Sequence, residues 1–359
     1  EVGAQRILQA LARPFQIDDM SFSVGCSIGV ALACPSHTPD QLLQQADDAM
    51  YRAKQRGRGR SEIYSDAMRA EARDRVALTN ALERALATGQ MRLVYQPIVD
   101  IVSDRVVGAE ALLRWPESGV GPDQFIPAAE AVGQIIPIGD WVMQEACRAH
   151  KRWLSQGLPA IPISVNVSAL QMRQKDFRFK LLSVLRQQRL PADALQIELT
   201  ESTLLEDVDY AVYLLNNLQQ DGVKISLDDF GTGYSSLSYL SRLPINKIKI
   251  DKSFVGHLTT DATSRAVTEA IITLSRRLKL DIIAEGIETT TMLDQVRLLG
   301  CQQVQVVCAF VFVPANAAAI GCIKSHFNWV RDWVAGLKLN RCCAPIPKHR
   351  SRSPISNIT

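Results

Sequence analysis

Two adjacent carboxylates, Asp228 and Asp229, follow the apolar run 223–227 and precede a glycine-containing polar stretch, 230–237. Neighbouring carboxylates repel each other unless a cation lies between them. A divalent ion that binds phosphate is the commonest functional reason for such a pair. A solvated Asp-Asp turn, in which Gly supplies a positive φ, accounts for the same residues. This stretch alone therefore leaves a metal site and a simple turn equally open.

Other apolar runs of the chain also contain or end in a single polar residue. These residues are Glu110, Asn166, Glu198, Asp228 with Asp229, Lys249, Glu285 and Gln305. A charge isolated in a buried strand is costly, so a polar group on each of seven strands predicts one shared site. Carboxylate and amide oxygens, without Cys or His, favour Mg²⁺ or Mn²⁺ over zinc. Lys249 suits an anionic substrate, although any one of these residues alone could be an ordinary strand-end polar group.

The elements that must position these residues begin at Met91, where strand-like runs alternate with amphipathic helical stretches. This alternation predicts an α/β fold, a TIM-like (β/α)₈ barrel whose functional groups gather at the carboxyl ends of the strands. The strand-like runs are Arg92–Ile98, Val106–Trp115, Ile161–Val167, Leu195–Thr200, Val223–Asp229, Asn246–Ile250, Leu280–Glu285 and Val304–Phe310. Only Asp100–Arg105 joins the first two runs, which is too short for a crossover helix. We therefore expect an antiparallel first strand.

Residues 1–64 predict part of a smaller α/β unit. Ala4–Leu11 has a helical pattern, Ser21–Ala33 reads as a strand, and a second helix begins after Thr38 and ends near 56–59. So few elements make a marginal core, which indicates the end of a larger domain. Residues 65–90 are charged and Ala-rich and predict a linker helix. The barrel is expected over 91–335 and a disordered basic tail over 336–359.

Composition places the chain among soluble globular proteins, with 47% hydrophobic and 21% charged residues. The net charge of +3 is too small to indicate nucleic-acid binding. Eight cysteines without a Cys-x-x-Cys pair predict free thiols in a reducing compartment, the cytoplasm. Five scattered histidines argue against zinc. The first residue is Glu1, so we expect a fragment whose upstream sensory or membrane domain is missing.

Seven motifs from Tyr95 to Glu288 resemble the EAL-domain cyclic di-GMP phosphodiesterases in content, order and spacing. They are Tyr95–Ile98, Glu110–Trp115, Asn166–Ser168, Glu198–Glu201, Asp228–Leu237, Lys249–Val255 and Ala284–Glu288. The resemblance implies a barrel that hydrolyses cyclic di-GMP to linear pGpG in bacterial signalling with two Mg²⁺ or Mn²⁺ ions. It also suggests a homodimer.

The resemblance assigns roles to the matching residues. Metal ligands are Glu110, Asn166, Glu198 and Asp228 for one ion, and Asp228 with Asp229 for the second. Lys249 would orient the attacking water, Glu285 would join the metal site, and Glu288 would hold the loop 228–237. Gln96, Arg114 and Gln305 would contact the ligand, and the planar fork of Arg114 suits phosphate oxygens.

Residues 1–64 resemble the C-terminal half of a GGDEF domain, the diguanylate cyclase family. Val24–Ala31 and Ala46–Lys54 carry this likeness. The GGDEF signature itself does not occur in the chain, so no cyclase activity is expected.

The family pattern ends after Gln305, where Val306 stands in place of an expected glycine. A β-branched residue is strained at positive φ, so we expect strain or crowding at Val306. A reading-frame change after Gln305 and a divergent basic tail both explain the remaining sequence. A tail that binds nucleic acid or anionic lipid is a further alternative.

Three functions therefore stand side by side. The intact acidic residues and Lys249 favour a metal-dependent phosphodiesterase. The altered stretch 306–313 favours a barrel that binds cyclic di-GMP without hydrolysing it. A barrel that serves only dimerisation is the third, and no motif in the sequence supports it.

Overall fold

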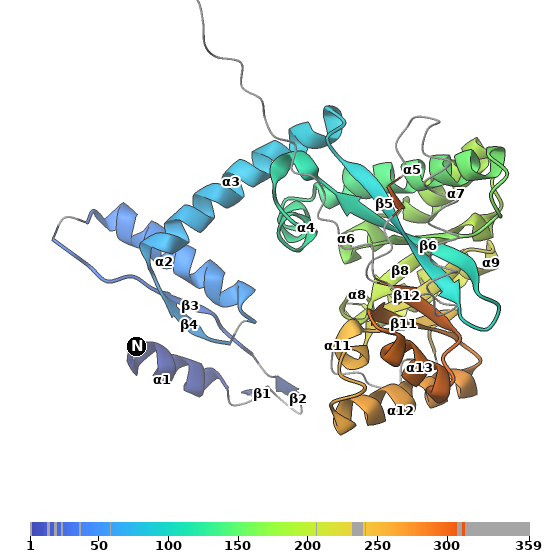
Figure 1. Cartoon of the computed structure of the whole chain (residues 1–359). Coiled ribbons are helices and arrows are strands. Elements are labelled where there is room, and N and C mark those ends of the chain that lie inside the picture. The colour runs from blue at the N-terminus through green and yellow to red at the C-terminus, as the bar shows by residue number, and fades with distance from the viewer. Residues whose placement is uncertain are drawn as a thin grey trace, which may run out of the picture. The chain divides into compact units, whose positions relative to one another are not determined.

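The computed structural model describes residues 2–12, 15–17, 20–22, 24–35, 37–57, 59–205, 207–231, 240, 242–306 and 311–312 of the 359-residue chain (Figure 1). The chain divides into two compact units. One comprises residues 1–90 and 115–134, and the other comprises residues 91–114 and 135–359. Within the described ranges, no helix has both the length and the apolarity needed to cross a membrane.

The first unit contains short strands and four α-helices. Its elements are α1 (Val2–Leu11), β1 (Phe15–Ile17), β2 (Met20–Phe22), β3 (Ile28–Val30), α2 (Pro39–Gln55), β4 (Ser61–Ile63), α3 (Asp66–Ala87), the 3₁₀ turn η1 (Pro116–Ser118) and α4 (Pro122–Ala131). The strand expected over Ser21–Ala33 is wrong in extent, because β2 and β3 are separate. Gly25 lies between them and offers no side chain to pack in a strand.

Helix α2 begins where the sequence predicts. The Thr38 side chain accepts a hydrogen bond from the Gln41 amide, and the Gln41 side chain accepts one from the Thr38 amide, which forms a capping box. The helix packs on the parallel pair β3–β4. Gly29 permits the close approach, because a Cβ there would overlap the backbone of Ala46 and Met50. Residues 66–87 form helix α3, and its role as a linker stays a prediction.

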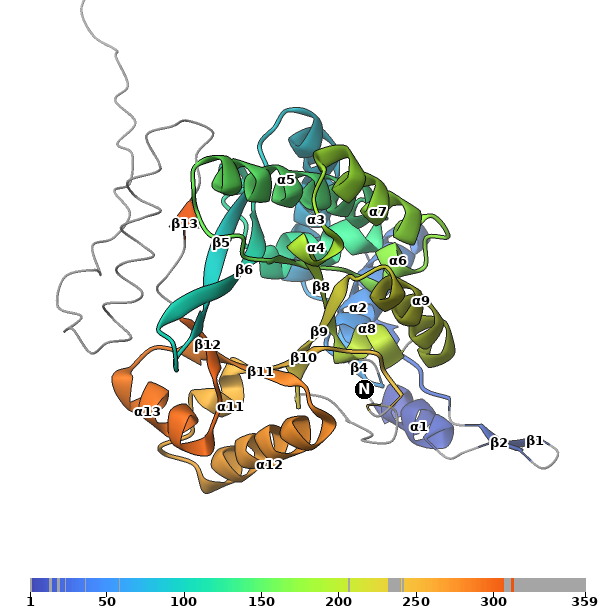
Figure 2. The ribbon, with the colours of Figure 1, turned by 90° about the vertical axis from the view of Figure 1, so that its right-hand side faces the viewer.

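The second unit is a closed barrel of eight strands with helices outside it (Figure 2). The barrel strands are β5 (Arg92–Asp100), β6 (Arg105–Arg114), β7 (Ile163–Asn166), β8 (Leu195–Thr200), β9 (Lys224–Phe230), β10 (Lys247–Ile250), β11 (Asp281–Ile287) and β12 (Gln303–Val306). The helices are α5 (Ile135–Ser155), α6 (Ala169–Met172), α7 (Phe177–Gln188), α8 (Glu201–Leu205), α9 (Val208–Gln220), α11 (Lys252–Val255), α12 (Ala262–Leu278) and α13 (Thr290–Leu299), with a 3₁₀ turn η2 (Ala192–Ala194).

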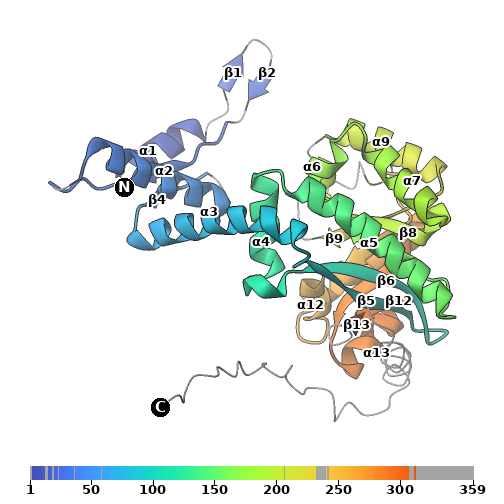
Figure 3. The same cartoon turned by 90° about the horizontal axis from the view of Figure 1, so that it is seen from above.

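Strand order confirms the predicted barrel and its irregular start. Strands β6 to β12 pair in parallel in chain order, whereas β5 is antiparallel to both β6 and β12. The pairing of Gln305 with Ile98 closes the ring. A short strand, β13 (Val311–Phe312), pairs antiparallel with Val94 and Tyr95 of β5. Helix α5 lies along the outside of β5 and β6 (Figure 3).

The closing strand differs from the sequence expectation. A strand was predicted over Val304–Phe310, but β12 ends at Val306 and residues 307–310 lie outside the described part of the chain. Val306 is 2% exposed and is not among the described residues with positive φ, so the strain expected at this position does not occur. The predicted basic tail 336–359 also lies outside the described residues.

The described cysteines carry free thiols. Cys147 and Cys301 are buried, and burial raises the pKa of Cys147 to about 12 and that of Cys301 to about 11. These thiols are therefore protonated at neutral pH and behave as small apolar side chains.

Candidate active site

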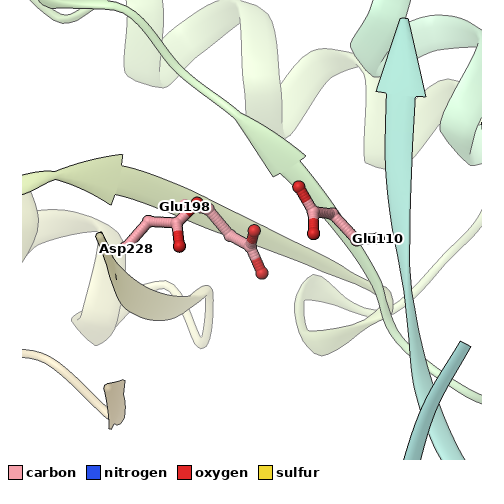
Figure 4. Close-up of side chains that lie close together, drawn as sticks. All are labelled: Glu110, Glu198 and Asp228. Carbon is pink, nitrogen blue, oxygen red and sulfur yellow. The ribbon is translucent and has the colours of Figure 1, made fainter. Parts of the chain in front are cut away.

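The strand ends of the barrel bring the predicted acidic residues together. Side chains alternate between the two faces of a strand, so Glu110, Glu198 and Asp228 point into the barrel from three strands and face one another (Figure 4). Each contributes a carboxylate oxygen, and these oxygens lie within 4.8 Å of one another. The shared site predicted from the sequence is therefore present in the fold.

A single ammonium lies at the centre of this cluster. Lys249 Nζ is 3.0 Å from Glu110 Oε2, 2.8 Å from Glu198 Oε2, 3.2 Å from Asp228 Oδ1 and 2.6 Å from Glu285 Oε1. The lysine side chain is 1% exposed. Three buried carboxylates and the partly exposed Glu285 would repel one another strongly, and burial opposes the charge on the lysine. The four carboxylates overcome that burial cost and raise the pKa of Lys249 well above its usual range.

Glu110 is the best-satisfied carboxylate of the cluster. Burial alone would raise its pKa, but the charge of Lys249 and hydrogen bonds from Gln305, Lys249 and Asn166 together lower it. Asn166 Nδ2 donates to Glu110 Oε1 at 2.7 Å, and Gln305 Nε2 donates to Oε2 at 2.6 Å. Glu110 is thus held ionised without any further cation.

Glu198 and Glu285 share the same ammonium but have fewer donors. Burial raises the pKa of each to about 8 in spite of Lys249, and repulsion from neighbouring carboxylates adds to the effect. One ammonium has only three protons to donate, so these two carboxylates are incompletely neutralised and favour an additional cation.

A second group of carboxylates lies beside the first and is formed by Asp228, Asp229 and Glu285. Strand alternation would turn Asp229 away from the site. Its φ of 52° lies in the left-handed region and breaks that alternation. Burial and the neighbouring Asp228 raise the pKa of Asp229 to about 6. The two groups share Asp228, which is the arrangement expected of a two-metal site.

Gly286 fixes the position of Glu285 at the end of β11. Its φ is +71°, and an added Cβ would come 3.2 Å from the Lys252 Cα and closer still to the Lys252 Cβ. Both the backbone angle and the contact require glycine. Helix α11 therefore packs directly against the residue after Glu285.

The residues predicted to contact a ligand have structural partners as well. Gln305 Nε2 donates to Gln96 Oε1 at 3.0 Å, and Gln96 Nε2 donates to the carbonyl of Val306 at 2.8 Å. These bonds tie the closing strand to β5 and to Glu110. Arg114 is half-buried, and its Nη1 donates to the carbonyl of Leu113 at 2.8 Å.

Asn166 is exposed although its amide binds Glu110. Glu288 is exposed just after β11. Residues 232–237 of the loop 228–237 that it is predicted to hold lie outside the described residues, so that prediction stays open.

Among the interior polar residues that did not figure in the sequence analysis are Ser226 and Lys247. Both are buried, and each lies two residues before a member of the cluster, Asp228 and Lys249 respectively. The two-residue period of a strand places them on the same inner face. That period was available from the sequence and could have identified both residues.

The donor set fits divalent metal ions. It consists of carboxylate oxygens and one amide oxygen, which Mg²⁺ and Mn²⁺ prefer. The incomplete neutralisation of Glu198 and Glu285 supports the same assignment. Together the fold and the site define a barrel with a buried acidic cluster that is consistent with a metal site.

Comparison with known families identifies that class. The EAL domain family matches residues 79–305, and the diguanylate cyclase GGDEF domain family matches residues 1–60. This chain belongs to the EAL domain family, and its barrel follows part of a GGDEF domain.

Curated relatives span both domains. The bifunctional diguanylate cyclase/cyclic di-GMP phosphodiesterase MucR of Pseudomonas aeruginosa is 40% identical over 306 residues, covering 84% of this chain and 45% of MucR. The cyclic di-GMP phosphodiesterase PdeR of Escherichia coli is 37% identical over 294 residues, covering 80% of this chain and 44% of PdeR. The chain thus spans less than half the length of these relatives.

A solved structure of the PaMucR phosphodiesterase in complex with c-di-GMP has the same fold. It is 42% identical with a TM-score of 0.62, and the match covers 64% of this chain and 94% of that chain. The EAL domain of Mycobacterium smegmatis DcpA is 31% identical with a TM-score of 0.54, covering 60% and 90% of the respective chains.

Proposed function

We propose that this barrel hydrolyses one phosphodiester bond of cyclic di-GMP to give linear pGpG, with two Mg²⁺ or Mn²⁺ ions. The observation that carries the proposal is the pair of carboxylate groups that share Asp228. Two such groups side by side suit two cations and an anionic phosphodiester between them. The 42% identity to the PaMucR phosphodiesterase, whose structure contains c-di-GMP, supports this substrate.

The metals, when bound, would acidify a water molecule and neutralise negative charge on the phosphate. Glu110, Asn166, Glu198 and Asp228 would hold one ion, and Asp228 with Asp229 and Glu285 would hold the other. Lys249 contacts four of these carboxylates. Its ammonium would orient the attacking water toward phosphorus and fix the carboxylates relative to one another.

Arg114 and Gln96 would orient the substrate from β6 and β5. The guanidinium is half-buried, and burial lowers the pKa of Arg114 although Glu110 opposes this effect. Desolvated arginine binds phosphate oxygens strongly because its planar fork matches them. Gln96 would act on the side of the barrel where β5 meets β12. The predicted homodimer stays a prediction.

The test is to incubate the purified chain with cyclic di-GMP and Mn²⁺ or Mg²⁺ and to separate the products by chromatography. We expect pGpG from the wild type. We expect Glu110→Gln to lose about 100-fold or more of the turnover, since changes even to groups behind metal ligands cost 10–100-fold.

A matched control is Glu269→Gln, which makes the same change at an exposed position of α12. It should keep full turnover. Unchanged turnover in Glu110→Gln would refute the metal assignment. Tight binding of cyclic di-GMP without any pGpG would show a binding module instead.

A further inference from the structure

Two buried polar atoms behind the acidic cluster have no hydrogen-bond partner among the described residues. They are Ser226 Oγ and Glu198 Oε1. Each of these two residues is only 1% exposed. Leaving a buried donor or acceptor unsatisfied is costly, so two such atoms at one place indicate a partner that is not a protein group.

The strand register places these two residues side by side. Glu198 on β8 pairs directly with Ser226 on β9. Neighbouring strands lie about 4.8 Å apart. Ser226 shares the inner face with Asp228, two residues further on, and Glu198 Oε2 binds Lys249 inside the barrel. Both atoms without a partner therefore belong to the barrel interior, at the strand position two residues before Asp228.

Lys247 provides a third polar group at this level. It pairs with Ser226 from the other side, on β10. Its side chain is buried, and no hydrogen bond of its ammonium to another described residue is found. Lys247 and Glu198 therefore flank Ser226 on its two neighbouring strands.

We propose that Lys247, Ser226 and Glu198 bind one internal water molecule, and that Ser226 is a positioning residue for Glu198. Buried waters typically make two to four hydrogen bonds to polar groups that are otherwise unsatisfied. This water would accept from the Lys247 ammonium, donate to Glu198 Oε1 and bond to Ser226 Oγ. It would fix the orientation of the Glu198 carboxylate, whose other oxygen faces Lys249.

The consequence for Glu198 rests on the proposed metal site, but the water itself does not. A crystal structure of the whole chain that resolves ordered solvent tests it directly. We expect density for a water about 3 Å from both Ser226 Oγ and Glu198 Oε1. A direct hydrogen bond from Ser226 or Lys247 to Glu198 Oε1, with no water between, would overturn the proposal.

Metal binding tests the positioning role with a readout other than activity. Free Mn²⁺ measured by electron paramagnetic resonance gives the dissociation constant of each variant. We expect Ser226→Ala to bind Mn²⁺ about 10-fold more weakly, the low end of the effect of removing a group behind a metal ligand. Ser226→Thr keeps the hydroxyl and should restore most of the affinity.

Ser275→Ala is the matched control, because Ser275 is equally buried but its hydroxyl donates to the carbonyl of Ile271 on its own helix. It should leave Mn²⁺ affinity unchanged. Equal affinities of wild type and Ser226→Ala would refute the positioning role. A wild type that binds no Mn²⁺ would instead refute the proposed function, and the water density would still decide the internal site.

A double-mutant cycle tests whether Lys247 belongs to the same site. Lys247→Met should change Mn²⁺ affinity more in the wild-type background than in Ser226→Ala, because its partner water has already lost one ligand there. Equal effects in the two backgrounds would exclude Lys247 from the site.

Discussion

At the level of single residues, the ammonium of Lys249 contacts four carboxylates inside the barrel. Glu110 receives three side-chain donors and stays ionised, whereas Glu198 and Glu285 have pKa values near 8. The difference follows from the number of donors, because all three share Lys249. A cluster with one ammonium and four carboxylates is suited to bind further cations.

The first prediction concerns Glu198→Gln. With a pKa of about 8, Glu198 is largely protonated at neutral pH in the absence of metal, so a neutral amide should alter the melting temperature little under those conditions. Metal binding requires the carboxylate, so the rise in melting temperature on adding Mn²⁺ should be lost. Differential scanning fluorimetry measures both, with Glu269→Gln as control. A full Mn²⁺ response in Glu198→Gln would contradict the assignment.

The second prediction concerns pH. The folded pKa values of Glu198 and Glu285, about 8, lie above the value of 4.5 for an unperturbed Glu. Between these values the folded state binds more protons than the unfolded state, so stability falls as pH rises. The pKa of Glu110 is lowered, so its contribution to stability rises with pH instead. That contribution is complete above about pH 5.

In EDTA, the melting temperature of the barrel should therefore fall from about pH 5 to about pH 8. Glu198→Gln should flatten this slope. Mn²⁺ should restore stability most at the high end of the range, where the ligands are deprotonated. A melting temperature that rises steadily with pH in EDTA would contradict the raised pKa values.

At the level of elements, the closing strand decides whether the barrel is complete. Strand β12 pairs with β11 on one side and with β5 on the other. Gln305 links it to Gln96 and Glu110. Closure and the acidic site are thus stabilised by the same side chain.

The third prediction is that Val306→Gly destabilises the barrel, although glycine matches the family pattern. Val306 is buried in extended backbone, so the change loses the burial of a Val side chain and adds backbone entropy. Together these cost about 2–4 kcal/mol in the free energy of unfolding. Urea denaturation measures this cost. The exposed Val102 is the control, and its change to Gly should cost less than about 1 kcal/mol. A more stable Val306→Gly would show that the site prefers glycine.

At the level of the whole molecule, the chain has two compact units. Only the barrel unit contains the carboxylate groups. Compact units of one chain can unfold independently.

The fourth prediction is that differential scanning calorimetry of the full chain shows two transitions. Mn²⁺ should raise only the transition of the barrel, because a ligand stabilises the state that binds it. The Glu198→Gln chain serves as control, and neither of its transitions should move. A single transition that shifts as a whole with Mn²⁺ would show that the two units unfold together.

Much of this molecule follows from sequence pattern. The alternation of strands and helices predicts the barrel, and the short connection after Asp100 predicts the antiparallel first strand. Thr38 and its capping box mark the start of α2. The N-terminal strand was predicted less well, because short β2 and β3 pair with different partners and carry no long alternating pattern.

The sequence by itself determined which groups would gather in one cluster, since Glu110, Glu198, Asp228 and Lys249 each interrupt an apolar strand. Only the tertiary structure decided how they combine. The left-handed backbone of Asp229 brings it to the same side as Asp228, and the ring closure places Gln305 on Glu110. Both depend on contacts between strands far apart in the chain, which local pattern does not specify.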